Sequence, residues 1–474
     1  MFLRLLCAVC VLTVGANSKD WLQFRGPNSS GIADETNLPD EFGPSKNVVW
    51  KTALPPGHSS PIVVGDRIFL TAFEADKLLT FCLDRVTGKI QWRRESPRPR
   101  TQELHKSNTP ASPSAVSDGK SIYVFFTDFG LISYGLDGNE RWKTAMGPFN
   151  NPFGMGASPV LVDNILLQSC DAESGSYFAA FDKNTGKELW RSERPEYSRG
   201  FSTPVLYEPA GGPKQAILAG SYQLTSYDVK TGKPVWWFRG LTWQLKPTPV
   251  LNKTKDTVYV LGWAGGSDTG QQESIADFAD VLKLWDKDGD KLLSKEEIPD
   301  DKVKKDWGAI DLDRDGKLGD RDWKLYQSRR AAQNMFQAIR LGPNPKGDIT
   351  ANARSWAYTK SLPNVPSPLF YDDVLYLMKE GGILTSINPA DGSVYKQGRL
   401  QGALSQYFAS PLASGGKLYM ISETGNVVVL KAGKDWEIIK VNDMDDEVHA
   451  TPAMVDGRIY LRTKSALYCF AKKD

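Results

Sequence analysis

The sequence has few cysteines and no excess of either charge, and both absences narrow what the protein can be. Among 474 residues there are five cysteines, and Cys7 and Cys10 lie in the apolar run at the N-terminus. The others, Cys82, Cys170 and Cys469, are far apart and make no disulfide framework, so the fold must be stabilised by burial. Lys and Arg total 58 against 56 acidic residues, which leaves no general field to attract nucleic acid or a membrane surface. We expect neither of these partners.

Common catalytic motifs are also missing. The chain has no Gly-x-Ser-x-Gly nucleophile turn, no His-Glu-x-x-His motif and no cysteine beside its three histidines. Because no residue stands out as a carrier of catalysis, we favour a non-catalytic role.

The N-terminus has the pattern of a signal peptide. A basic start is followed by an apolar run from Leu5 to Val14 and by the small residues Ala16-Asn17-Ser18. This run is too short to cross a membrane as a helix, and we expect no transmembrane segment. A lipoprotein would need a small residue before Cys10, where the chain has Val9. We therefore predict export to the periplasm or the extracellular space without a lipid anchor.

What the chain does have is a repeat. A Ser/Thr-Pro step followed by an apolar run recurs about every 45 residues, except in one interval that carries roughly 70 extra residues. This period is typical of β-propellers, in which each repeat forms one small sheet of a ring. The proline residues of the steps are Pro61, Pro113, Pro159, Pro204, Pro249, Pro368, Pro411 and Pro452. We predict an all-β, eight-bladed β-propeller, and an array of β-sandwiches is the alternative.

A turn within the repeat supports this prediction. In four repeats a glycine is followed by a tryptophan at the same spacing, as in Gly88/Trp92 and Gly138/Trp142. Glycine allows the positive φ of a tight hairpin, and the tryptophan can cover the edge between neighbouring sheets. The last repeat lacks a fourth strand, whereas an unpaired strand, residues 48–51, precedes the first repeat. We predict that this N-terminal strand closes the ring.

The long interval, which falls in blade five, contains a different kind of structure. Its periodicity becomes helical, with Ile275, Phe278, Leu282 and Trp285 on one stripe. Two acidic loops in this interval carry acids at loop places one, three, five and twelve, which is the pattern of a paired EF-hand that binds Ca²⁺ through oxygen ligands. The predicted ligands are Asp286, Asp288, Asp290, Leu292, Ser294 and Glu297 in loop one, and Asp311, Asp313, Asp315, Lys317 and Asp322 in loop two.

Both loops depart from the usual EF-hand pattern. Loop one has Lys291 where glycine normally makes the sharp turn, so we expect strain there. Loop two keeps Gly316 but ends in Asp322, whose side chain is shorter than that of glutamate. The apolar residues Leu293 and Leu318 suit a short ladder between the loops. We expect two calcium sites of modest affinity, and we favour a structural role for the insert over a calcium-controlled arm.

A second candidate site lies at the mouth of the channel. In a propeller the loops that enter the innermost strands meet around one end of the channel, so the residues three places before each proline should be neighbours. This place is His58 in blade one, Pro110 in blade two and His449 in blade eight, which adjoins blade one. Cations and aromatic groups together suit an anionic or sugar-like ligand, although side chains that cap strand ends would give the same pattern. The predicted mouth residues are His58, His105, Arg199, Trp243, Lys246, Tyr407 and His449. Two histidines at one place are too few ligands for a transition metal.

The residues quoted so far, with two further segments, carry a resemblance. The segment Asp20-Trp21-Leu22-Gln23-Phe24-Arg25-Gly26-Pro27-Asn28, the segment Gly57-His58-Ser59-Ser60-Pro61 and the Asp-x-x-Thr-Gly-Lys-x-x-Trp repeats are similar to those of secreted bacterial PQQ-like β-propeller repeat proteins. The resemblance covers nearly the whole chain after the signal peptide. It implies an eight-bladed, quinoprotein-like fold, and the family commonly carries an EF-hand pair in this interval.

The resemblance leaves the activity open. Quinoprotein alcohol dehydrogenases share the fold and hold pyrroloquinoline quinone (PQQ) with calcium at the channel mouth, typically against a disulfide between adjacent cysteines, beside an Asp base and Glu and Asn calcium ligands. This chain has no adjacent cysteines, so we expect no PQQ and assign no cofactor residues. A second analogue is the lipid-anchored outer-membrane assembly protein of the same fold, which is a scaffold.

The sequence therefore predicts a signal peptide (1–18), a propeller (19–265 and 333–474) and an inserted EF-hand pair (266–332). We expect a calcium-binding, non-catalytic binding or scaffolding module, monomeric, with a protein or carbohydrate partner at the mouth. A PQQ-dependent dehydrogenase that oxidises alcohols or sugars is the alternative.

Overall fold

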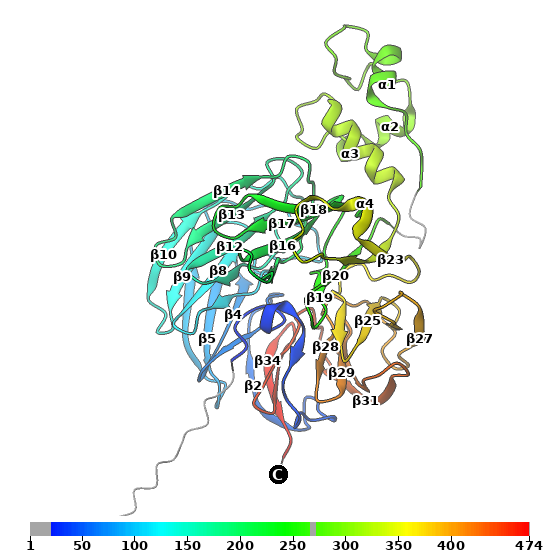
Figure 1. The fold of residues 1–474 in the computed structure, drawn as a ribbon. Coiled ribbons are helices and arrows are strands. Elements are labelled where there is room, and N and C mark those ends of the chain that lie inside the picture. Colours follow the sequence, from blue (N-terminus) through cyan, green and yellow to red (C-terminus); the bar gives the residue numbers. More distant parts are fainter. Residues whose placement is uncertain (1–19, 266–271, 474) are drawn as a thin grey trace, which may run out of the picture.

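Eight antiparallel sheets form a ring around a central channel in the computed structural model, which describes residues 20–265 and 272–473 (Figure 1). The predicted signal peptide, residues 1–18, lies outside the described residues. Each blade has four strands from the channel to the rim, and these are consecutive in the chain except in blade 5, which omits β22 (Gly347–Asp348), and in blade 8, whose outer strand comes from the N-terminal part. The prediction of an all-β, eight-bladed propeller is confirmed.

The strands of the first four blades follow one another along the chain. Blade 1 consists of β3 (Ile62–Val64), β4 (Arg67–Glu74), β5 (Lys77–Asp84) and β6 (Ile90–Ser96); blade 2 of β7 (Val116–Ser117), β8 (Ser121–Phe126), β9 (Gly130–Gly135) and β10 (Glu140–Ala145); blade 3 of β11 (Val160–Val162), β12 (Ile165–Cys170), β13 (Tyr177–Asp182) and β14 (Glu188–Glu193); and blade 4 of β15 (Val205–Tyr207), β16 (Gln215–Gly220), β17 (Gln223–Asp228) and β18 (Pro234–Arg239).

The remaining blades complete the ring. Blade 5 consists of β19 (Val250–Leu251), β20 (Thr257–Gly262), β21 (Met335–Arg340) and β23 (Arg354–Tyr358); blade 6 of β24 (Leu369–Tyr371), β25 (Val374–Lys379), β26 (Ile383–Ile387) and β27 (Val394–Arg399); blade 7 of β28 (Leu412–Ser414), β29 (Lys417–Ile421), β30 (Asn426–Lys431) and β31 (Glu437–Asp443); and blade 8 of β32 (Ala453–Val455), β33 (Arg458–Arg462), β34 (Ala466–Ala471) and β2 (Val48–Ala53). Two short strands pair in parallel outside the blades, β1 (Ile32–Ala33) with β28 and β22 (Gly347–Asp348) with β18.

The N-terminal strand closes the ring, as predicted. Strand β2 pairs antiparallel with the C-terminal strand β34, and Trp50 lies opposite Cys469. The Trp50 ring also packs against Tyr460, with 6.1 Å between ring centroids. Strand β2 thus supplies the fourth strand of blade 8, which otherwise has only three.

The Gly/Trp signature joins neighbouring blades at several junctions. The Trp92 indole of blade 1 covers Gly138 in blade 2, and a Cβ on that glycine would lie 2.7 Å from the ring. The indole N–H donates to Leu136 O across the same junction, at 2.9 Å. Trp236 differs, since its indole donates to Gln215 Oε1 within blade 4 (3.0 Å) and the edge of that blade is covered by β22 instead. The repeat signature is therefore an inter-blade contact as well as a turn.

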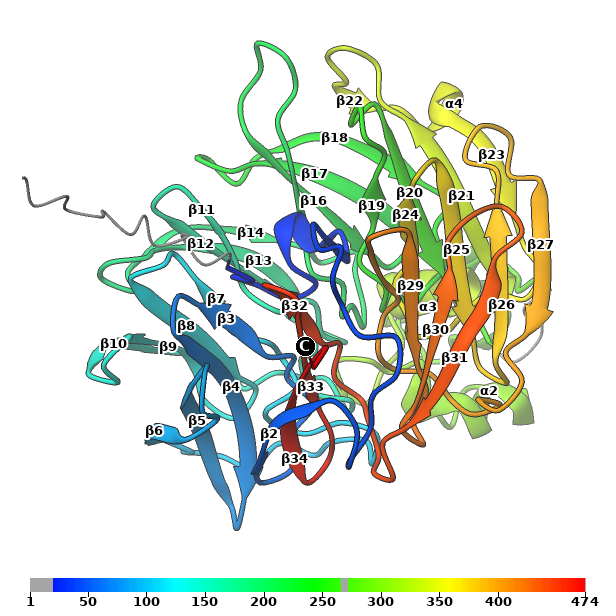
Figure 2. The ribbon, with the colours of Figure 1, turned by 90° about the horizontal axis from the view of Figure 1, so that it is seen from below.

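A segment before the first blade crosses one end of the channel. It includes the 3₁₀ turn η1 (Pro27–Ser29), which lies near the centre of the ring when the protein is seen from below (Figure 2). Trp21 exchanges hydrogen bonds with Val63, and the Asn28 side chain bonds both backbone groups of Leu206. These partners stand at the downstream ends of inner strands. The segment, residues 20–33, is therefore a plug at the end of the channel opposite the predicted mouth.

The interval between β20 and β21 forms the small helical insert. It contains α1 (Phe278–Trp285), α2 (Asp301–Asp306), the 3₁₀ turn η2 (Trp307–Ala309) and α3 (Asp320–Ala331), and it projects from the ring (Figure 1). A core of its own surrounds the buried Trp323 and Phe278. The helical turn α4 (Thr350–Ala353) precedes the last strand of blade 5. No helix in the described ranges is both long and apolar enough to cross a membrane.

Candidate functional site

A ring of hydroxyl side chains, one from each blade, lines the channel. The N–H of seven of the eight members donates to the side-chain oxygen of the next, as in Ser60 N to Ser114 Oγ (2.9 Å), and Thr451 N to Ser60 Oγ (3.0 Å) links blade 8 to blade 1. The members are Ser60, Ser114, Ser158, Thr203, Thr248, Ser367, Ser410 and Thr451. The repeated Ser/Thr of the sequence therefore has a role of its own, because its hydroxyl satisfies a backbone donor of the preceding blade.

Blade 2 departs from the predicted pattern. Its ring member is Ser114, and Ala115 stands where the other blades have proline, because an extended backbone at the start of a strand accepts either residue. The Pro113 step is two residues too early. The assignment of Pro110 to the mouth layer is therefore wrong, and Ser112 occupies that place.

The ring is broken between blades 4 and 5. Seven of its links are hydrogen bonds, but the described residues show none from Thr203 N to Thr248 Oγ1. At this junction Phe201 N instead donates to Leu245 O, at 2.9 Å. The Thr203 N–H and the Thr248 hydroxyl are thus left without the bond that the other blades make.

The ring and a second layer of side chains enclose a cavity of about 220 Å³. The second layer lies two residues before the ring and consists of His58, Ser112, Gly156, Phe201, Lys246, Val365, Phe408 and His449. Phe24 of the plug also lines the cavity. Among the described lining residues, Lys246 is the only one with an Asp, Glu, Lys or Arg side chain. The cavity therefore combines hydroxyls and aromatic rings with a single cation.

Lys246 is held by neutral groups. Its ammonium donates to Asn364 Oδ1 at 2.5 Å and lies 5.2 Å from the centre of the Trp263 ring. Burial, with a smaller contribution from the positive charge of Arg199, lowers the pKa of Lys246 to about 8, and the negative charge of Glu380, which does not line the cavity, acts in the opposite direction. Because an ammonium has three N–H donors, this one keeps hydrogen-bonding capacity for another acceptor.

The two histidines predicted to meet at the mouth are stacked. The His58 and His449 rings lie 4.2 Å apart and nearly parallel, and Phe408 stacks on the other face of His449 at 4.8 Å. Burial, together with the nearby His449 and Arg462, lowers the pKa of His58 to about 3, and burial also lowers the pKa of His449. Both rings therefore act at neutral pH as uncharged, flat walls between the cavity and an outer hollow of about 330 Å³.

Of the other predicted mouth residues, none lines the cavity. His105 is exposed, and its ring packs against Phe153, at 5.2 Å between centroids. Arg199 forms an ion pair with Glu173 and stacks on Phe153. Tyr407 is a core residue whose hydroxyl donates to Ala403 O (2.7 Å), so its assignment to the mouth is wrong. Tyr407 lies close to a Ser-Pro step in the sequence, but its side chain packs between blades 6 and 7, which the sequence does not reveal.

Trp243 belongs to the contact between the ring and the insert. The guanidinium of Arg329, on α3, lies 4.7 Å from the centre of the Trp243 ring, and Arg199 lies near it at 5.7 Å. Its indole N–H donates to Ala264 O. Trp243 is thus covered by the insert rather than open at the mouth.

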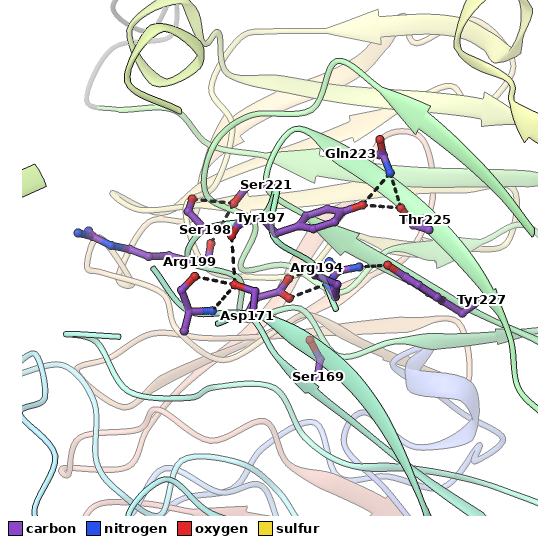
Figure 3. A network of polar contacts seen from close by, with 12 residues as sticks. Ser169, Asp171, Arg194, Tyr197, Ser198, Arg199, Ser221, Gln223, Thr225 and Tyr227 are labelled. Carbon is purple, nitrogen blue, oxygen red and sulfur yellow. Dashed lines mark hydrogen bonds and ion pairs between the residues drawn. The ribbon is translucent and has the colours of Figure 1, made fainter. Parts of the chain in front are cut away.

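A buried ion pair supports this side of the mouth (Figure 3). Arg194 donates to both carboxylate oxygens of Asp171, at 2.7 and 2.9 Å, and its guanidinium lies 3.6 Å from the centre of the Tyr197 ring. The Tyr197 hydroxyl in turn pairs with Thr225 Oγ1 at 2.6 Å. The ion pair and the Tyr197 hydrogen bond therefore hold the loop between β14 and β15 in place. No motif in the sequence marks this pair, because it consists of one isolated acid and one isolated base at the ends of two strands.

In the insert, the two acidic loops lie side by side. Leu293 and Leu318 exchange backbone hydrogen bonds of 3.0 and 2.8 Å, which is the short ladder expected between them. In each loop the first three acids bring their carboxylate oxygens within 4.8 Å of one another. Lys291 adopts φ +65°, a left-handed conformation that costs a residue with a side chain about 1 to 2 kcal/mol.

Loop one is internally paired. The Glu297 carboxylate accepts the backbone N–H of Lys287 (2.9 Å) and of Ser294 (2.8 Å). The ammonium of Lys317, which belongs to loop two, lies 2.6 Å from Asp290 Oδ2. A cation from the protein itself therefore contacts one of the predicted calcium ligands of loop one.

Loop two has unpaired carboxylate oxygens. Asp311 and Asp322 are only 6% and 5% exposed, and each has a buried Oδ1 without a hydrogen bond. The guanidinium of Arg321 lies 3.9 Å from Asp322 Oδ1, which is too far for a hydrogen bond. Burial raises the pKa of Asp322. Buried carboxylate oxygens with no donor are costly, and a hard cation such as Ca²⁺ would satisfy them, so the residues of loop two fit the ion.

Loop two also contacts the ring directly. Asn150 Nδ2 donates to Leu312 O at 2.7 Å, and Arg321 donates to Pro195 O at 2.7 Å and to Glu173 O at 2.9 Å. These contacts join the second and eleventh places of the loop to blades 2 and 3.

The channel does not fit pyrroloquinoline quinone as the quinoprotein dehydrogenases hold it. Its described lining contains no carboxylate that could act as a base or bind calcium beside the quinone. Cys82, Cys170 and Cys469 are free and lie buried in blades 1, 3 and 8. The stacking disulfide therefore has no counterpart.

Comparisons with known proteins agree with the architecture. BamB from Moraxella catarrhalis superposes with a TM-score of 0.57 at 12% identity, covering 90% of this chain and 97% of that chain. A europium-containing methanol dehydrogenase gives 0.59 at 10% identity (96% and 98%), and a quinohemoprotein alcohol dehydrogenase from Comamonas testosteroni gives 0.56 at 14% (97% and 82%). At these identities the likeness concerns the fold alone. No curated protein matches the sequence significantly.

The family model described as outer membrane protein assembly factor BamB matches residues 43–164, 174–296 and 346–474, which is most of the chain. The chain belongs to this family of β-propeller proteins.

Proposed function

We propose that this protein is an exported, non-catalytic β-propeller that binds calcium through loop two of its insert and holds a ligand or a protein partner at the channel mouth. The observation that carries the proposal is the channel lining, which pairs one cation with hydroxyls and aromatic rings and has no carboxylate or thiol in its described part. Such a surface can bind a ligand through hydrogen bonds and ring contacts. The family membership supports the same reading, since its name describes an assembly factor.

A dehydrogenase is the competing function, and one experiment separates the two. Purified protein is mixed with pyrroloquinoline quinone and CaCl₂, and quinone absorbance and dye reduction are followed with alcohols and sugars. We expect no stoichiometric uptake of the quinone and no dye reduction. Tight uptake of one quinone per chain would overturn the proposal.

Calcium would be held in loop two by Asp311, Asp313, Asp315, the Lys317 carbonyl and Asp322. A bound ion would coordinate the carboxylate oxygens of Asp311 and Asp322 that have no hydrogen bond. It would thereby stabilise the loop whose Arg321 contacts the ring. Such an arrangement supports a structural role of calcium, since the loop is already docked on the ring.

The calcium part is tested by thermal unfolding of the full chain with CaCl₂ or chelator. We expect calcium to raise the unfolding temperature of the wild type, because an ion that binds only the folded state stabilises it. Asp322→Asn should remove most of this shift, whereas Asp320→Asn, an exposed neighbour on α3, should keep it. Equal shifts in both variants would refute the assignment of loop two.

Export is the remaining element of the proposal, supported by the signal-peptide pattern. If the chain is exported, the mature protein should begin near Lys19. N-terminal sequencing of protein from the periplasmic fraction tests this.

A further inference from the structure

The break in the hydroxyl ring and the buried lysine lie on the same wall of the channel. Lys246 stands two residues before Thr248, and Phe201 stands two residues before Thr203, so that each pair faces the same side of an extended backbone. All four residues line the cavity. One junction between two blades therefore presents an ammonium, a backbone N–H and a hydroxyl that the rest of the ring does not use.

All three groups can donate hydrogen bonds. The Thr203 N–H has no partner among the described residues, and Thr248 Oγ1 does not accept the bond that its equivalents accept in the other blades. Among the described residues, the only hydrogen-bond acceptor of the Lys246 ammonium is the neutral Asn364 Oδ1. A buried cation is normally paired with an acid, and the described lining contains none. What this wall lacks is a negatively charged acceptor.

We propose that the channel cavity binds a small organic monocarboxylate, whose carboxylate accepts hydrogen bonds from Lys246 Nζ, Thr203 N and Thr248 Oγ1. This inference rests on the proposed binding function and names the class of ligand. A single lysine balances a single negative charge, so a dianion such as inorganic phosphate is disfavoured. The rest of the wall, with Phe24, Phe201 and Phe408, suits an apolar body next to the carboxylate.

The size of the cavity limits the ligand. A volume of 220 Å³ is smaller than the pockets of drug-sized ligands, which begin at roughly 300 Å³. The stacked rings of His58 and His449 narrow the way out to the outer hollow. A compact acid about the size of benzoate or pentanoate is therefore expected, rather than an oligosaccharide.

The test is calorimetric titration of the full chain with benzoate and pentanoate, each beside its neutral amide, and with inorganic phosphate. We expect at least one of the two acids to bind, and its amide to bind at least tenfold more weakly. Lys246→Met should weaken acid binding at least tenfold, and Thr248→Val, which keeps the shape of the side chain, severalfold. Lys464→Met, at the outer hollow, should stay within twofold of the wild type.

Several outcomes would overturn the inference. They are equal binding of acid and amide, unchanged binding in the folded Lys246→Met variant, binding of phosphate alone, or no binding of either acid at millimolar concentration. Thermal unfolding of each variant shows that it is folded. A protein or glycan partner that binds the wild type and Lys246→Met equally would leave the proposed binding module standing and reject only the carboxylate site. Stoichiometric quinone uptake would instead reject the proposed function.

Discussion

Replacement of Gly186 by alanine should destabilise the propeller through the blade that precedes it. Gly186 has φ +71°, and a Cβ at this position would lie 2.4 Å from Trp142 Cε3. The Trp142 indole, which donates to Lys183 O at 2.8 Å, must therefore move. Gly186→Ala therefore places an alanine in the left-handed region and displaces a nearly buried tryptophan. It disturbs both the turn at residue 186 and the contact between blades 2 and 3.

The magnitude follows from a matched glycine. Gly175 has a similar φ of +67° but nothing within 4 Å of a Cβ, so Gly175→Ala carries only the backbone cost. That cost is about 1 kcal/mol, because roughly 1 to 2 kcal/mol of left-handed strain is partly offset by the lower entropy of the unfolded chain. Gly186→Ala adds about 1 to 3 kcal/mol for overpacking and about 1 kcal/mol for the strained indole hydrogen bond. We expect it to lower the free energy of unfolding by about 3 to 5 kcal/mol.

Urea-induced unfolding followed by far-ultraviolet circular dichroism measures these differences. In a Trp142→Ala background the contact with the indole is gone and only the contact of the Cβ with Thr144 Oγ1, at 2.8 Å, remains, so Gly186→Ala should then cost clearly less than it does in the wild type. If Gly186→Ala and Gly175→Ala are equally destabilising in the wild type, or if the background makes no difference, the interlocking of blades through Gly/Trp pairs is refuted.

Two further predictions concern the insert and the mouth. Lys317→Met should raise the calcium affinity of loop one about twofold to fivefold, because the ammonium that contacts Asp290 no longer competes with the ion. Calorimetric titration with calcium measures this affinity, and the control variant Lys287→Met should leave it unchanged. If the calcium affinity of loop one is unchanged in both variants, Lys317 does not compete with the ion. Because burial lowers the pKa of His58 from 6.5 to about 3, the unfolded chain binds a proton that the folded chain rejects, and stability should fall as the pH drops from about 6.5 towards 3. His58→Phe should flatten this fall in unfolding temperature, whereas the exposed His105→Phe should not, and parallel curves for all three proteins would exclude His58 as a cause.

Much of the architecture could be predicted because it is repeated. A turn glycine and a tryptophan at constant spacing impose the same hairpin in successive blades, and a missing last strand can be replaced only by a free one, which residues 48–51 supply. Blade 2 is an imperfect repeat, and there the predicted mouth residue was wrong. The prediction counted from Pro113, but proline is tolerated at several places near the start of a strand.

The site was predicted less well. Lys246, His58 and His449 do face the cavity, since their distance from the Ser/Thr-Pro step sets their layer. Tyr407 and Trp243 do not, because no sequence rule says towards which neighbour a loop side chain turns. Phe24 of the plug was not among the predicted mouth residues, although it lines the cavity from the opposite end of the channel.

By itself the sequence determined the number of blades, the closure of the ring and the place of the acidic loops, because local turn chemistry and spacing are written along the chain. Only the tertiary structure decided which groups meet across the channel. The gap between Thr203 and Thr248, the unsatisfied carboxylate of Asp322 and the contact of Lys317 with loop one each depend on segments far apart in sequence, and their energies depend on burial that no spacing reveals.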